Sequence, residues 1–153
     1  MAVLKEGSKA PVFKGIDQDG KPVSLSDFKG KKVILYFYPH DDTPTCTIQA
    51  CNLRDNYPAL IKKGFKVIGI STDTVKSHKK FEDKFDLPFP LIADEDKKIV
   101  GQYNVWGEKQ FMGRTFNGTF RTTFLIDETG KIKKILDKPD SANHTAEILA
   151  AWK

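Results

Sequence analysis

Cysteine is scarce in this sequence. Its 153 residues include only two, Cys46 and Cys51, which lie five positions apart. Two cysteines are too few for the disulfide framework on which small secreted domains depend. A close pair of thiols in a protein kept reduced is more often catalytic or metal-binding. The shortage therefore directs attention to this pair.

Ligands for a metal are also scarce. A structural zinc ion takes about four protein ligands. Besides the two cysteines the chain offers three scattered histidines, His40, His78 and His144, and it has neither a CxxC nor an HExxH motif. The sequence therefore predicts no metal and favours a catalytic use of the thiols.

Long apolar runs are missing as well. The composition is 39% hydrophobic and 29% charged, and no segment approaches the roughly 18 apolar residues of a membrane span. The opening MAVLKEGSKAP lacks the apolar core and cleavage pattern of a secretory leader. We therefore expect a soluble globular protein in the cytoplasm, with residues 1–153 forming a single domain.

Arginine is rare although the chain is basic. The formal net charge is +5, but 22 of the 25 basic residues other than histidine are lysines and only three are arginines. The lysines are spread in short groups near acidic residues and form no Arg-rich stripe. This distribution is typical of a solvated surface, so we expect neither a nucleic acid nor a membrane as a partner.

Hydrophobic patterning predicts alternating strands and helices. The runs KKVILYFY and FKVIGIST are almost continuously apolar and rich in β-branched and aromatic residues, as in strands buried on both faces. The predicted elements are a hairpin of 11–16 with 22–25, strands at 31–38 and 65–72, a helix at 44–63 interrupted near Pro58, a helix at 74–85, a short strand at 88–92, a short helix at 96–103, a hairpin of 119–126 with 131–136, and a helix capped by Ser141 or Asn143 and ending at 152. This order predicts a three-layer α/β fold with a mixed central sheet and an N-terminal hairpin.

Cys46 lies at a predicted helix start. Thr43 is a capping residue, Pro44 suits the first helical position, and the thiol of Cys46 comes third, where a capping box often has a carboxylate. Free backbone N–H groups and the helix dipole favour an anion there, and the hydroxyl of Thr43 can donate to it. We therefore expect Cys46 to be a thiolate nucleophile. The alternative is a small buried hydrophobic residue.

Cys51 lies deeper in the same predicted helix. On an intact helix, five residues place the two Cα atoms roughly 8.7 Å apart and about 140° apart in direction, whereas a disulfide tolerates about 7 Å. The two thiols therefore cannot bond while the helix is intact. Any disulfide chemistry between them requires the first helical turns to unwind.

The sequence around the thiols resembles the peroxiredoxins. YFYPHDDTPTC matches the signature Pro-x-x-x-Thr-x-x-Cys at Pro39, Thr43 and Cys46. QAC-x-LRD after it, VWGEK at 105–109 and RTTFLID at 121–127 resemble the subfamily of the bacterioferritin comigratory protein, also called peroxiredoxin Q. The resemblance extends over essentially the whole chain. A departure is Thr45, because the family commonly has glycine before the cysteine.

The resemblance implies a thioredoxin-like fold and the reduction of hydrogen peroxide or alkyl hydroperoxides without a cofactor. It implies that Cys46 attacks the peroxide, that Arg121 activates both the thiolate and the peroxide, and that Pro39 shields the thiol. Cys51 would be the second, resolving thiol, which condenses with the sulfenic acid before further oxidation. The family further implies a monomer that thioredoxin or a glutaredoxin-like dithiol reduces.

Other interpretations remain for these residues and for the whole chain. Arg121 could instead form a surface ion pair with an acid such as Glu108. Tyr38, Trp106 and Phe111 could line the site or belong to the core, and His40 is expected to face solvent. A thiol-disulfide oxidoreductase would share the fold, although the chain lacks its CxxC motif. A redox-sensing or protein-holding module would switch shape without turnover.

Overall fold

The computed structural model describes residues 4–152, apart from the side chain of Phe111. Its centre is a five-stranded sheet of order β5-β4-β3-β8-β9. The middle strand pairs in parallel with β4 and antiparallel with β8, so the sheet is mixed, as predicted. The strands of the molecule are β1 (Lys14–Ile16), β2 (Pro22–Ser24), β3 (Lys32–Phe37), β4 (Phe65–Ser71), β5 (Leu91–Ala93), β6 (Trp106–Phe111), β7 (Arg114–Thr119), β8 (Thr122–Ile126) and β9 (Ile132–Leu136).

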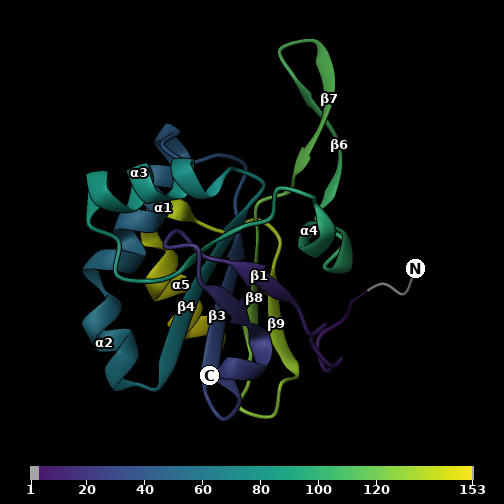
Figure 1. Cartoon of the computed structure of the whole chain (residues 1–153). Coiled ribbons are helices and arrows are strands. Elements are labelled where there is room, and N and C mark those ends of the chain that lie inside the picture. The colour runs from purple at the N-terminus through teal and green to yellow at the C-terminus, as the bar shows by residue number, and fades with distance from the viewer. Residues whose placement is uncertain (1–3, 153) are drawn as a thin grey trace.

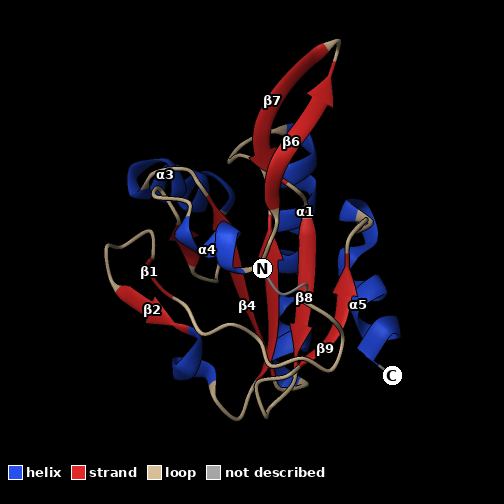
Figure 2. Ribbon diagram, turned by 90° about the vertical axis from the view of Figure 1, so that its right-hand side faces the viewer, coloured by secondary structure: helices blue, strands red, loops and turns tan. Residues whose placement is uncertain are grey.

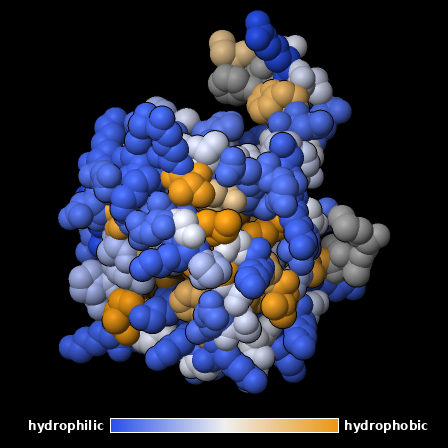
Figure 3. All heavy atoms as spheres, viewed as in Figure 1, coloured by the Kyte–Doolittle hydropathy of each residue, from blue (hydrophilic) through white to orange (hydrophobic). Residues whose placement is uncertain are grey.

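Helices and the small N-terminal hairpin cover the two faces of this sheet (Figures 1 and 2). The helices are α1 (Pro44–Asp55), α2 (Tyr57–Lys62), α3 (Val75–Phe85), α4 (Lys98–Gln102) and α5 (His144–Trp152), with short 3-10 turns at Leu25–Phe28 and Ser141–Asn143. Within the described residues, no helix is both long enough and apolar enough to cross a membrane. The face drawn in Figure 3 is mostly hydrophilic, with small separate apolar patches.

Alternation along β3 divides the core into two clusters. Val33, Leu35 and Phe37 point into one cluster together with the N-terminal hairpin and α4. Ile34 and Tyr36 point into the other, which includes residues of α1, α2, α3 and α5. Successive side chains of a strand point to opposite faces of the sheet. A strand covered on both faces therefore needs apolar residues at consecutive positions, rather than apolar and polar residues in alternation. The predicted three-layer arrangement is confirmed.

The predicted interruption of the long helix is also confirmed. The helix breaks at Asn56, between α1 and α2, two residues before Pro58. The ring of a proline clashes with the carbonyl four residues earlier and its nitrogen cannot donate, so the helix ends before the proline and a new helix begins with Pro58 in its first turn.

Several predicted boundaries were wrong by a few residues. Strand β5 begins at Leu91 rather than at residue 88, and α4 is shorter than predicted at both ends. The predicted capping of α5 by Ser141 or Asn143 was wrong. Among the described residues, the buried Ser141 hydroxyl has no hydrogen-bond partner, and the only bond of the Asn143 side chain is its donation to Asp140. The final helix nevertheless ends at Trp152, as predicted.

The hairpin of β6 and β7 was not predicted at all. Its two strands pair antiparallel and project away from the body of the molecule (Figures 1 and 2). A two-residue turn joins them, in which Met112 and Gly113 both have positive φ, 52° and 78°. Two positive φ values define the hairpin turn that glycine favours at its second central position. Gly113 was therefore the available signal.

Candidate active site

The thiol of Cys46 lies at the beginning of α1, as predicted. Pro44 is the first residue of the helix and Cys46 is the third. The first N–H groups of a helix have no partner within it, so they favour a negative charge. Cys46 is 1% exposed, and this exclusion of water strengthens its interaction with any nearby charge.

Arg121 contacts the thiol of Cys46, as predicted from the sequence. Its Nη2 donates to the Sγ of Cys46 at 3.2 Å, and its Nη1 donates to the Oε1 of Gln49 at 2.8 Å. Arg121 directly precedes β8, which pairs with β3, and the loop that leads to Cys46 follows β3. Sheet pairing thus brings the arginine to the thiol. Within the described part of the chain, Arg121 forms no ion pair with Glu108 or another acid.

Gln49 and Tyr36 are parts of this site that the sequence reasoning missed. Gln49 lies three residues after Cys46, on the same face of the helix, and that spacing was the available signal. Its Nε2 and the hydroxyl of Tyr36 are buried donors without a hydrogen-bond partner among the described residues. Burial, and next the charge of Cys46, hold the pKa of Tyr36 well above its ordinary value, so this hydroxyl keeps its proton beside the thiol.

The expected hydrogen bond from Thr43 to Cys46 is absent from this conformation. The hydroxyl of Thr43 donates its one proton to the carbonyl of His40, at 3.0 Å. A hydroxyl often bonds to the nearby backbone in this way and so competes with its capping role. Thr43 still starts the helix, because its carbonyl accepts from the N–H of Thr47 at 2.9 Å. Pro39 is half-buried in the same loop.

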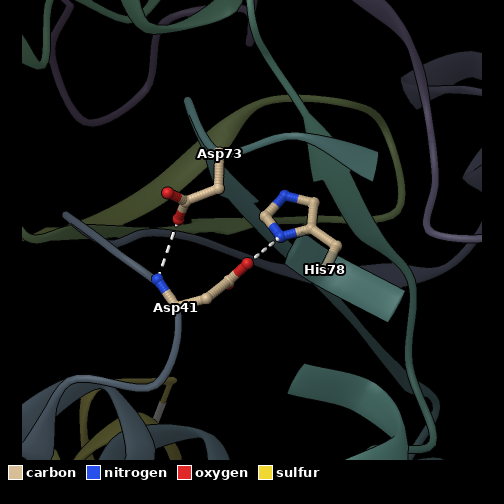
Figure 4. A group of neighbouring side chains, drawn as sticks. All are labelled: Asp41, Asp73 and His78. Atoms are coloured by element: carbon tan, nitrogen blue, oxygen red, sulfur yellow. Dashed lines mark hydrogen bonds and ion pairs between the residues drawn. The ribbon is translucent and has the colours of Figure 1, made fainter. Parts of the chain in front are cut away.

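Asp41 anchors this loop to the neighbouring helix (Figure 4). Its carboxylate accepts from the hydroxyls of Tyr38 (2.6 Å) and Ser77 (2.7 Å), and it lies 2.6 Å from Nδ1 of His78. The N–H of Asp41 also donates to Asp73 at 2.8 Å. Burial, and next the charge of Asp41, hold the pKa of Tyr38 well above its usual value. The loop before α1 is therefore fixed from both its backbone and its side chains.

The same network contains the one group of described residues that could hold a metal ion, Asp41, Asp73 and His78. These atoms already have protein partners. Both ring nitrogens of His78 face acceptors, Nδ1 toward Asp41 at 2.6 Å and Nε2 toward the carbonyl of Ile92 at 2.9 Å. Both ring nitrogens are thus already in contact with protein oxygens, which a metal ion would have to displace. The arrangement therefore fits a hydrogen-bonded anchor.

Cys51 lies farther along α1 and is half-buried, and both cysteines are free thiols. Because α1 is continuous from Pro44 to Asp55, helical geometry keeps the two Cα atoms roughly 8.7 Å apart. This separation exceeds the reach of a disulfide. In this structure α1 is intact, so the two thiols cannot form a disulfide with each other.

Lys109 is a second cation near the thiol, and the sequence reasoning passed over it. Its Nζ donates to the carbonyl of Thr119 at 2.9 Å. Partial burial, and next the charge of Arg121, lower the pKa of Lys109, whereas the charge of Cys46 acts in the opposite direction. This lysine on β6 therefore adds positive potential to the same side of the site.

The remaining candidates lie around the site or away from it. Tyr38 is buried and stacks on Tyr36, with ring centroids 5.4 Å apart. Trp106 packs against the core cluster of the opposite face and carries Lys97 over its ring. The side chain of Phe111 lies outside the described structure. The side chain of His40 is 66% exposed, so its predicted position in solvent is confirmed.

Comparison with known sequences identifies relatives along nearly the whole chain. The model of the AhpC/TSA family matches residues 7–135. Peroxiredoxin Bcp of Escherichia coli is 48% identical over 149 residues, which cover 97% of this chain and 96% of the relative. A putative peroxiredoxin bcp of Coxiella burnetii is 47% identical over 146 residues, which cover 95% and 97% of the two chains.

Solved structures confirm the predicted thioredoxin-like fold. A cysteine-to-serine mutant of Xylella fastidiosa PrxQ matches with a TM-score of 0.91 and 27% identity, over 99% of this chain and 97% of that one. The bacterioferritin comigratory protein of Xanthomonas campestris, solved to explain its alkyl peroxide reduction activity, matches with a TM-score of 0.86 and 31% identity. That match covers 99% of this chain and 96% of the other.

Proposed function

Because the chain belongs to the AhpC/TSA family as a peroxiredoxin of the Bcp and Q type, and is therefore a thiol peroxidase, we propose that Cys46 is its peroxidatic residue. Hydrogen peroxide and alkyl hydroperoxides are the proposed substrates. The observation that carries this assignment is the contact of Arg121 with the Cys46 thiol at 3.2 Å.

In the first step, the Cys46 thiolate attacks one oxygen of the peroxide. An S–O bond forms and the O–O bond breaks, and the leaving oxygen takes a proton to become water or an alcohol. The sulfur is oxidised to a sulfenic acid. Arg121 has fixed donors that stabilise the thiolate and also the negative charge that develops on the leaving oxygen. We propose that Pro39 and Thr43 line the site and shield the Cys46 thiol from solvent.

In the second step, the first turns of α1 unwind and the sulfur of Cys51 attacks the sulfenic sulfur of Cys46. An S–S bond forms, and the S–O bond breaks with loss of water. Unwinding is required because roughly 8.7 Å separates the two Cα atoms on the helix. It breaks few bonds, since Pro44 has no N–H and the next amides have no helical acceptor.

A dithiol donor completes the cycle by exchange with the Cys46–Cys51 disulfide. We propose thioredoxin or a glutaredoxin-like protein as this reductant, acting in the cytoplasm on a monomer, with neither nucleic acid nor membrane as a partner. Two electrons from the dithiol balance the two taken by the peroxide. The proposed cycle therefore closes without a metal, flavin or haem.

The deciding experiment measures steady peroxide consumption by the protein in the presence of thioredoxin, thioredoxin reductase and NADPH. We expect several turnovers per protein molecule and an intramolecular disulfide in the oxidised form, detected by mass spectrometry. A sensing module would react once and stop. A thiol-disulfide oxidoreductase would reduce disulfides without consuming peroxide, and either result would overturn the proposal.

A further inference from the structure

Asn52, the residue that follows Cys51, attaches α1 to the beginning of α5. Its Nδ2 donates to the carbonyl of Ala142 at 2.9 Å. Its Oδ1 accepts from both the N–H and the hydroxyl of Thr145, each at 2.8 Å. The side-chain amide is therefore bonded at both ends to the segment that opens α5.

These bonds satisfy groups that α5 cannot satisfy itself. The first N–H groups of a helix have no acceptor within it, and Asn52 supplies one of the missing acceptors from another helix. Thr145 is buried, with 6% exposure, and Leu53, next to Asn52, is fully buried in the core. Polar and apolar contacts thus fix this part of α1 to the body of the protein.

The preceding turns of α1 are also packed into the core, with Cys46 and Ala50 1% and 0% exposed, but they have fewer polar attachments. Among the described side chains of residues 44–51, hydrogen bonds to other elements are made only by Cys46 and Gln49, and both lead to the guanidinium of Arg121. Reaction with peroxide changes the sulfur that makes one of them. The polar attachment of these turns therefore depends on the state of Cys46, whereas the polar attachment of Asn52 does not.

The loop before α1 is fixed as well. Asp41 is held by Tyr38, Ser77 and His78 through its carboxylate and by Asp73 through its N–H. Firm attachments thus lie at Asp41 and at Asn52, and the ten residues 42–51 lie between them. Cys51 is the last residue of this segment and adjoins the fixed side.

We propose that Asn52 is a positioning residue for disulfide formation. It holds Cys51 at the fixed end of α1, so that the unwinding which follows sulfenic acid formation stops at Cys51 and Cys46 moves to it. This inference rests on the proposed Cys46–Cys51 chemistry. Its physical basis is that a held nucleophile meets its target at a much higher effective concentration than a free one.

The direction in which loss of Asn52 changes the rate of disulfide formation distinguishes positioning of Cys51 from simple stabilisation of the helix. If Asn52 only stabilised α1, its loss would ease unwinding and speed disulfide formation. If Asn52 positions Cys51, its loss lets the unwinding extend beyond Cys51 and disperses the thiol, so disulfide formation slows. Peroxide attack on Cys46 precedes unwinding and keeps its rate in both cases.

The experiment compares Asn52→Ala, Thr145→Val and the control Asn56→Ala with the wild type. Thr145→Val removes the hydroxyl bond to Asn52 but keeps the N–H bond, and it leaves α1 unchanged in sequence. Asn56→Ala removes a side-chain bond to the carbonyl of Asn52 within the end of the helix and leaves the link to α5 intact. Stopped-flow fluorescence and rapid quenching with mass spectrometry follow the sulfenic acid and the disulfide separately.

We expect disulfide formation to slow about tenfold in Asn52→Ala, the order of effect that a small loss of placement produces, and less in Thr145→Val. Slower resolution also leaves more sulfinic acid at high peroxide. In the oxidised wild type, hydrogen exchange should show lost protection up to residue 51 and not beyond. In oxidised Asn52→Ala the loss should reach residue 55, while Asn56→Ala resolves at the wild-type rate or faster.

An unchanged or faster disulfide step in both Asn52→Ala and Thr145→Val would overturn the positioning role. Equal slowing in Asn56→Ala would also overturn it, because the effect would then belong to the helix end. If the wild type itself formed no Cys46–Cys51 disulfide, the proposed catalytic cycle would fail instead. The two failures are therefore distinguishable.

Discussion

The first two turns of α1 and its last turn belong to one continuous helix, but they are attached to the protein in different ways. The first turns carry Cys46, and their described side chains make hydrogen bonds to other elements only through the guanidinium of Arg121. The last turn carries Asn52, which is bonded to α5, and the fully buried Leu53. Cys46 thus lies where the hydrogen bonds to other elements are few and include its own sulfur, and Cys51 adjoins the part of α1 that Asn52 bonds to α5.

The difference shows how one helix can serve two successive needs. In the proposed cycle, a folded helix start favours the thiolate of Cys46 during attack on peroxide. The same turns must then unwind before the proposed disulfide can form. Because the N-terminal amides lack helical acceptors, unwinding removes only a few backbone bonds, each worth about 1 kcal/mol net. Substitutions in and around the first turns of α1 should therefore have effects of different size on the two steps of the proposed cycle.

Removing either sulfur should have the largest effect on peroxide turnover. Cys46→Ser should lower peroxide turnover by at least about a thousandfold, because the nucleophile itself is lost. Cys51→Ser should still reduce one equivalent of peroxide and then stop as the sulfenic acid. A peroxide assay with mass spectrometry of the product measures both. Dithiol-driven turnover at the wild-type rate in Cys46→Ser would contradict the assignment of the two roles.

Replacing the charged contact of the first turns should have the next largest effect. Arg121→Gln should slow the peroxide step about 10- to 100-fold, since a hydrogen bond to a charged group contributes about 1.5–3 kcal/mol. The variant also loses the hydrogen bond that the Cys46 sulfur accepts at 3.2 Å, so alkylation of Cys46 at neutral pH should slow. Arg114→Gln, which removes an exposed arginine of the β6–β7 hairpin, is the control. Alkylation of Cys46 at the wild-type rate in Arg121→Gln would exclude this role for Arg121.

Changing the ease of unwinding should have the smallest effect. Thr45 is exposed at the second position of α1, and its β-branched side chain limits the backbone states gained on unwinding. Thr45→Gly should therefore speed disulfide formation about two- to fivefold, in line with about 0.5–1 kcal/mol for such a change. Stopped-flow fluorescence after one equivalent of peroxide measures this rate.

Thr45→Ala is the matched control for this prediction, because alanine has no β-branch but favours the helix. It should not speed the disulfide step. A glycine variant that resolves no faster than the wild type would show that unwinding of these turns does not limit the rate.

The sequence predicted most of what local patterns determine. The apolar runs of β3 and β4 and the turn between β8 and β9 gave strands in nearly their observed positions. The hairpin of β6 and β7 escaped prediction because it buries little apolar surface, and apolar periodicity is the main signal for a strand. The short strand β5 was displaced because three residues carry too little pattern to set a boundary.

The candidate site could be predicted only in part, for a similar reason. Cys46 was found from its place at a predicted helix start, and Arg121 from a motif that resembles a known family. The contacts of Gln49, Asp41 and Asn52 join residues 72, 37 and 93 positions apart in the sequence. No local spacing specifies such pairs, because tertiary folding brings them together. The error at Thr43 was local, since its hydroxyl had two competing partners.

The sheet order has a consequence for the protein while it is being made. Arg121 follows Cys46 by 75 residues, and β8, which positions the arginine, pairs with β3 near the other end of the chain. Synthesis proceeds from the N-terminus at roughly 5–20 residues per second. For several seconds on the ribosome, the nascent chain therefore carries Cys46 without its cation, and the contact proposed to activate the thiol can form only after β8 has been synthesised.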